Sequence, residues 1–204
     1  MRWPIHASKI KTVPTSEPLD LTETKRFLDI DASDTNDDSL VAALIKAARD
    51  RFEDYTGRRL ITQDWYLYLN DWPGSEVYPD SDYEDEIELP GTPLISVTAV
   101  KYYDQSGIAY TFAATNYHAD VSTEPGRIVL AGTATWPSTT SLRPSQGIEI
   151  EYKCGYGAAY SNVPPGIQLI LQMLVQHWFH NRSDLGRVSS EVQSMMDDYR
   201  ILYL

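Results

Sequence analysis

The sequence predicts an α+β protein: a small helical bundle interrupted by an antiparallel β-rich insertion and followed by a C-terminal helical tail. Near both ends of the chain, apolar residues recur at spacings of three and four, the period of an amphipathic helix. From Leu60 to Cys154, short runs of alternating polar and apolar residues are separated by Gly, Pro, Asn and Asp, which is typical of strands joined by turns. Strands without intervening helices favour antiparallel pairing.

The predicted boundaries follow these changes of period. Residues 1–18 contain three prolines and no sustained apolar period, so we expect an extended N-terminal arm. Residues 19–59 and 160–182 are expected to form the helical core, and residues 60–159 the β-rich insertion. Residues 183–204 form the predicted tail.

Three helices are predicted in the core. A short one follows Asp20, whose side chain can cap its first turn. The second runs from about Asn36 to Tyr55 and ends before Gly57, a residue suited to the left-handed C-terminal position. The third begins at Pro165, which favours a first helical turn. Its apolar face comprises Ile167, Ile170, Leu171, Leu174, Val175 and Trp178.

Period-two alternation predicts the strands of the insertion. The clearest case has Ile148, Ile150 and Tyr152 on one face and charged residues on the other. The full set of expected strands is residues 61–70, 87–89, 95–103, 108–112, 117–121, 127–131 and 148–153.

The C-terminal segment carries a second, narrower apolar stripe. It comprises Val188, Val192, Met195, Met196, Tyr199 and Leu202, and the sequence ends in Ile201-Leu202-Tyr203-Leu204. A free terminus is normally solvated, so an apolar one either awaits a partner or folds back on its own core.

Charge and composition bound the function. The net charge is −12, from 29 acidic and 17 basic residues, which argues against gripping nucleic acid through phosphate neutralisation. It is compatible with a channel through which DNA slides.

The single Cys154 excludes an intrachain disulfide and suits a reducing cytoplasm. No apolar stretch reaches the roughly 18 residues of a membrane span. The 14 tyrosines and five tryptophans suit either partner interfaces or half-buried sheets.

Candidate catalytic motifs are weak. His177 and His180 could share a helix face as metal ligands, but a structural pair flanking Trp178 is favoured. The acidic run of residues 80–86 could hold calcium but lacks the glycine turn of an EF-hand, which favours a solvated loop. Gly155-Tyr156-Gly157 lacks the lysine of a phosphate loop. No catalytic residue, metal site or cofactor is therefore predicted.

A series of motifs resembles the phage head-tail connector (adaptor) proteins. The signature helix runs from Asp37 to Arg58. The further matches, in the same order, are Leu89-Pro90, Pro93 to Val97, Val100 to Asp104, Pro125 to Ile128, Tyr152 to Gly157 with Val163-Pro164, and His177 to Arg182. The resemblance covers roughly residues 18 to 182. It is strongest to the version of the family with a β-rich insertion, found in tailed phages and phage-like gene transfer particles.

The resemblance implies a function without catalysis. It implies a ring of twelve copies docked beneath the portal, carrying the stopper or tail-completion protein, with DNA passing through its channel without specific binding and no membrane involved. The protein would be made in the bacterial cytoplasm and reside in the virion neck. By the same resemblance the C-terminal segment binds the portal through Met195, Met196, Tyr199, Ile201, Leu202, Tyr203 and Leu204.

Two alternatives remain open from the sequence. One is a virion surface module whose aromatic-rich β region recognises carbohydrate. The other is a metal-dependent hydrolase using His177, His180 and the acidic run. Metal content and glycan binding of the purified protein discriminate between them.

Overall fold

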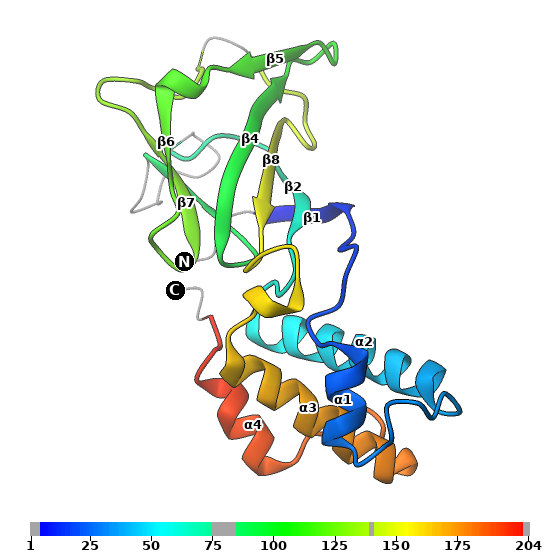
Figure 1. Ribbon diagram of the computed structural model, residues 1–204. Coiled ribbons are helices and arrows are strands. Elements are labelled where there is room, and N and C mark those ends of the chain that lie inside the picture. The colour runs from blue at the N-terminus through cyan, green and yellow to red at the C-terminus, as the bar shows by residue number, and fades with distance from the viewer. Residues whose placement is uncertain (1–4, 75–84, 139–140, 202–204) are drawn as a thin grey trace. The chain divides into compact units, whose positions relative to one another are not determined.

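The computed structural model describes residues 5–74, 85–138 and 141–201. The chain divides into two compact units (Figure 1). The β unit contains the described residues before Pro14 together with Gln63–Gly155, and the helical unit contains Pro14–Thr62 and Tyr156–Ile201. The predicted α+β class is confirmed, because helices and antiparallel strands lie in separate parts of the chain.

The β unit contains a five-stranded and a three-stranded antiparallel sheet. The larger sheet has the order β1 (Ile5–Thr12), β2 (Gln63–Leu69), β8 (Ile148–Cys154), β4 (Leu94–Tyr103) and β5 (Ala109–Phe112). The smaller sheet has the order β3 (Glu86–Leu89), β7 (Gly126–Leu130) and β6 (Tyr117–Asp120), with a short 3₁₀ turn at Ala114–Asn116.

Alternation along the central strands builds the core of the β unit. Leu67 and Ile150 are register partners on β2 and β8, and both are fully buried. Their sequence neighbours point to the other face and are half-buried, as a period of two requires. An aromatic group completes this core, in which Trp72 and Trp136 stack with ring centroids 4.9 Å apart.

The arm predicted for residues 1–18 is in part a strand. Strand β1 pairs antiparallel with β2 and places Lys9 opposite Tyr66 and Ser8 opposite Leu67. Every described side chain from Ala7 to Thr12 is exposed, so no apolar alternation marks this strand in the sequence. It pairs through backbone hydrogen bonds at a sheet edge, which the apolar pattern does not encode, and the Lys11 ammonium adds an ion pair with Glu151 at 2.6 Å.

The helical unit contains four α-helices, of which α2 and α3 form the centre. They are α1 (Leu21–Phe27), α2 (Asp38–Thr56), α3 (Pro165–His180) and α4 (Ser190–Asp197), with 3₁₀ turns at Tyr160–Asn162 and Arg182–Asp184. The predicted caps are confirmed: the Asp20 carboxylate accepts a hydrogen bond from the Glu23 amide at 3.0 Å, and Gly57 ends α2 with φ 76°.

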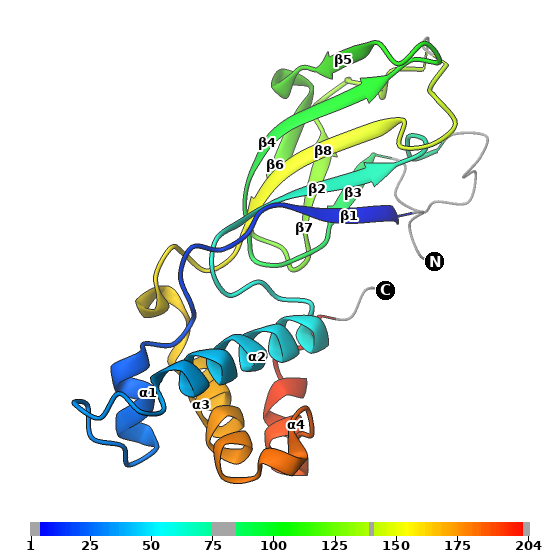
Figure 2. The ribbon, with the colours of Figure 1, turned by 90° about the vertical axis from the view of Figure 1, so that its right-hand side faces the viewer.

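The apolar faces of α2 and α3 pack on each other (Figure 2). Val41, Ala48 and Phe52 of α2 are fully buried, as are Ile167, Leu171 and Val175 of α3. Within the described ranges, none of the helices has the length and apolar character required to span a membrane.

Candidate functional site

The C-terminal segment packs on the helical unit of its own chain. Val192 and Met196 of α4 are buried and belong to the same core as α2 and α3. Met195 and Tyr199 are half-buried against that core. The structure therefore contains the folded-back arrangement for the segment up to Ile201. The predicted portal-binding residues Leu202, Tyr203 and Leu204 lie outside the described residues.

A buried arginine holds the chain just after α4. The guanidinium Nε of Arg58 donates to the carbonyl oxygen of Tyr199 at 2.7 Å, and Nη1 donates to the Tyr156 hydroxyl at 2.9 Å. The same guanidinium lies 5.9 Å from the centroid of the Tyr199 ring. Arg58 is only 9% exposed, so these bonds operate where water competes weakly. The contact joins the end of α2 to the tail.

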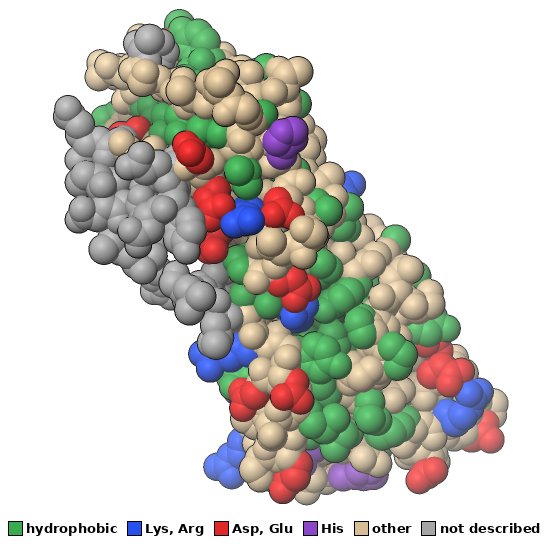
Figure 3. Space-filling model, turned by 90° about the vertical axis from the view of Figure 1, so that its left-hand side faces the viewer, with side chains coloured by type: hydrophobic (Ala, Val, Ile, Leu, Met, Phe, Trp, Pro, Cys, Tyr) green, Lys and Arg blue, Asp and Glu red, His purple; other side chains and the backbone are tan. Residues whose placement is uncertain are grey.

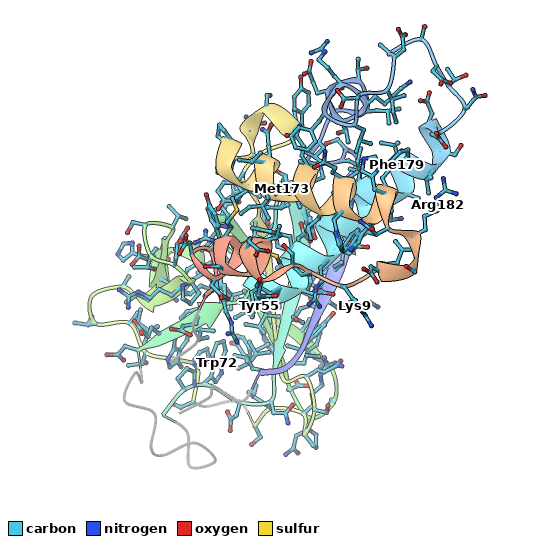
Figure 4. The ribbon with its side chains drawn as sticks, turned by 90° about the horizontal axis from the view of Figure 1, so that it is seen from below. Lys9, Tyr55, Trp72, Met173, Phe179 and Arg182 are labelled. Carbon is cyan, nitrogen blue, oxygen red and sulfur yellow. The ribbon has the colours of Figure 1, made fainter. Side chains whose placement is uncertain are left out.

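Helix α2 provides further contacts to the tail (Figure 4). The Tyr55 hydroxyl donates a hydrogen bond to the carboxylate of Asp197, and this bond raises the pKa of the Tyr55 phenol. The Arg200 guanidinium lies 5.4 Å from the Tyr55 ring centroid. The Ile201 amide donates to the carbonyl of Thr56 at 2.9 Å. Together these contacts fix the path of the chain beyond α4.

Gly166, in the first turn of α3, leaves room for Tyr199. A Cβ atom at this position would lie 2.5 Å from the Tyr199 hydroxyl oxygen, well inside van der Waals contact. A larger residue at position 166 would therefore require the Tyr199 hydroxyl to shift, whereas the nearest ring carbon would lie at an ordinary contact distance of 3.7 Å. The sequence shows the glycine but not the ring that approaches it.

Buried Lys25 fixes the connection between α1 and α2. Its Nζ donates to the carbonyl oxygens of Ala32 and Asp34 at 3.1 and 2.5 Å, and it pairs with the Asp38 carboxylate at 2.7 Å. Lysine is rarely buried, and sequence reasoning missed both this residue and Arg58. Their roles depend on backbone carbonyls brought together by the fold, for which no residue pattern gives a signal.

The candidate catalytic residues lie apart from the tail contacts. His177 and His180 occupy the last turn of α3, where the His180 ring meets Phe179 edge-on with centroids 5.4 Å apart. Of the acidic run, residues 80–84 lie outside the described residues, and Glu86 pairs with Arg127 at 2.8 Å. Among the residues that the structure describes, no three His, Cys, Asp or Glu side chains are grouped as a metal site requires.

The fold and its contacts define an α+β protein, in which a helical core carries an inserted β unit and α4 packs on that core. The chain belongs to the head completion protein family, whose sequence profile matches residues 19–197. This match confirms the predicted resemblance to phage head-tail connectors and supports the head-tail adaptor function that it implies.

Solved structures share the whole fold. A chain in the neck of an empty gene transfer agent particle, computed with C6 symmetry, has a TM-score of 0.76 and 21% identity, with 97% of each chain covered. A chain in the virion of a native gene transfer agent particle has a TM-score of 0.76 and 20% identity over 97% of this chain and 96% of that one. A chain in the native neck, computed with C12 symmetry, has a TM-score of 0.67 and 22% identity over 96% and 97%. No curated protein matches the chain.

Proposed function

We propose that the protein is a non-enzymatic head-tail adaptor that forms a ring of twelve copies in the neck of a tailed phage or phage-like particle. The observation that carries this proposal is the family match over residues 19–197, which spans most of both units. The similar neck structures, computed with C6 and C12 symmetry, support the number, because twelve copies satisfy both symmetries.

In the proposed ring the protein continues the DNA channel beneath the portal and carries the stopper or tail-completion protein. A net charge of −12 per chain supports a channel wall that does not bind phosphates tightly, so DNA passes without specific binding. The proposed assembly involves no membrane. The chain would be made in the bacterial cytoplasm and assembled into the virion neck.

The C-terminal segment is proposed as the portal-binding element. Its anchors are Met195, Met196, Tyr199, Ile201, Leu202, Tyr203 and Leu204. Met196 is fully buried in the helical unit, so contact of this side chain with the portal requires α4 to leave its position. That movement breaks the contacts of Arg58 and Tyr55 with the tail.

Electron microscopy of the protein mixed with its portal protein tests the ring. We expect a ring of density added to one end of the portal; portals that remain bare at saturating protein would contradict the proposal.

Deletion of residues 202–204 tests the tail. It leaves α4 and its described contacts in place, and circular dichroism checks that the subunit remains folded. We expect weaker portal binding. Unchanged affinity of the deleted protein would remove these three residues from the proposed interface.

A further inference from the structure

Helix α3 is unusual in its lack of acidic and strongly basic side chains. Its 16 residues include no Asp, Glu, Lys or Arg, in a chain of which 23% is charged. The inner face belongs to the core, so its apolar character is explained. The outer face is also uncharged, whereas the solvent face of a helix normally carries charge. It consists of Leu169, Gln172, Met173, Gln176 and His180.

Exposed apolar side chains mark this outer face. Leu169 is 43% exposed, and Met173, one turn further along, is half-buried. Figure 3 shows hydrophobic side chains, in green, gathered in the middle of the helical unit on the face that is turned toward the viewer. A contiguous apolar surface of this kind marks an interaction site more often than an isolated exposed leucine does.

The opposite side of the helix pair is formed by α2. The exposed residues of its amino-terminal half are Ser39, Ala42, Ala43, Lys46 and Ala47. Four of the five are small, which allows another helix to approach closely, and none is acidic. Because α2 and α3 pack on each other through their buried faces, these two outer faces point in opposite directions (Figures 2 and 3).

We propose that the outer face of α3 binds the outer face of the amino-terminal half of α2 on a second copy of this chain. The inference rests on the proposed ring. A ring requires two different, complementary patches on opposite sides of each subunit. The bulky Leu169 and Met173 on one face match the small residues around Ala43 on the other.

Charge favours the same pairing. Copies that each carry a net charge of −12 repel one another, so they can associate only where acidic groups are few. The ten residues of these two faces include no carboxylate, although Glu17 and Asp50 lie beside Lys46 and Arg49 at the edge of the α2 face. The amide oxygens of Gln172 and Gln176 can accept hydrogen bonds from the Lys46 ammonium of the neighbouring copy. A stable interface buries about 800 Å² on each partner, so this helix pair forms the centre of a larger contact.

Cysteine crosslinking tests the pairing. The double variant Leu169→Cys with Ala43→Cys is made in a Cys154→Ala background, which removes the single native thiol. A short bismaleimide then captures even transient contacts at high protein concentration. A contact between two different faces links each chain to two neighbours, so we expect a ladder of covalent species beyond the dimer.

Matched controls make the outcome decisive. Each single-cysteine variant can give at most dimers, and Leu169→Cys with Ile108→Cys moves one thiol to another exposed apolar position, in the β unit. The pairing is overturned if the test pair gives only dimers, or no more ladder than this control.

Electron microscopy of the same variants with portal separates the two proposals. Rings on the portal without the ladder refute the α2–α3 pairing and leave the adaptor function intact. A ladder without rings on the portal supports the pairing and contradicts the adaptor function.

Discussion

Replacing Met196 by alanine tests whether α4 is part of the folded helical unit. The Met196 side chain is fully buried among residues of α2 and α3. Truncating a buried methionine to alanine removes apolar contacts and leaves a cavity, with a loss of about 2–5 kcal/mol. The loss is also bounded by the free energy of docking α4, because an eight-residue terminal helix can detach rather than tolerate a cavity. We therefore expect a decrease of about 2–3 kcal/mol.

The free energy of unfolding is measured by urea titration of the full chain. The matched control is Met195→Ala, because the Met195 side chain is only half-buried. The control should lose about 1 kcal/mol or less, since its side chain already meets solvent. Hydrogen exchange of the Ile201 amide, which donates to Thr56, reports detachment of the tail directly. If both variants lose the same small amount and the Ile201 amide exchanges rapidly in the unmodified protein, α4 is not docked as described.

Two further predictions concern the polar contacts of the helical unit. The neutral Tyr55 phenol is stabilised by its bond to Asp197, which raises its pKa; this contribution is complete below pH 10 and is lost as the pH rises through the folded-state pKa. We expect the tail to loosen in alkaline solution, measured as a fall in the protection factor of the Ile201 amide, which is the intrinsic exchange rate at each pH divided by the observed rate. Tyr55→Phe should remove that fall, and an unchanged fall would refute the link. Lys25→Met should decrease stability by about 2–3 kcal/mol, because it leaves the carbonyls of Ala32 and Asp34 without their donor. Arg26→Met is the control at an exposed position, and its free energy of unfolding in the same urea titration should lie within about 0.5 kcal/mol of that of the unmodified protein. Equal losses in the two variants would contradict the role of Lys25.

The sequence predicts elements whose side chains carry a period, and misses those that depend on the backbone. Helices α2 and α3 are recognised because their buried residues recur every three or four positions, and β8 because Ile148, Ile150 and Tyr152 alternate with charges. Strand β1 carries no such period, since its described side chains are exposed on both faces. Its place in the sheet depends on main-chain hydrogen bonds to β2, which most residue types make equally well.

The tail shows a second limit of sequence reasoning. An apolar stripe predicts that α4 is covered, but the same stripe suits a partner's groove and the chain's own core equally well. The contacts that favour the core come from Arg58, Tyr55 and Gly166, residues distant in sequence from α4. Their contacts with the tail are a hydrogen bond from Arg58, a hydrogen bond from Tyr55 and a close approach at Gly166, and a hydrophobic pattern indicates none of these.

Docking of α4 on its own chain and portal binding through Met196 compete for the same side chain. If both occur, the apparent affinity for the portal equals the intrinsic affinity multiplied by the fraction of chains in which α4 is detached. A variant that weakens docking without altering the tail should then strengthen portal binding. Tyr55→Phe is such a variant, because Tyr55 belongs to α2 and its hydroxyl meets Asp197 rather than a proposed anchor. We expect a lower Kd for the portal at neutral pH, measured by titration, with the exposed Arg26→Met variant as a control that leaves Kd unchanged. An unchanged Kd for Tyr55→Phe would mean that α4 remains docked in the complex, and would restrict portal contact to residues that are accessible in the folded chain.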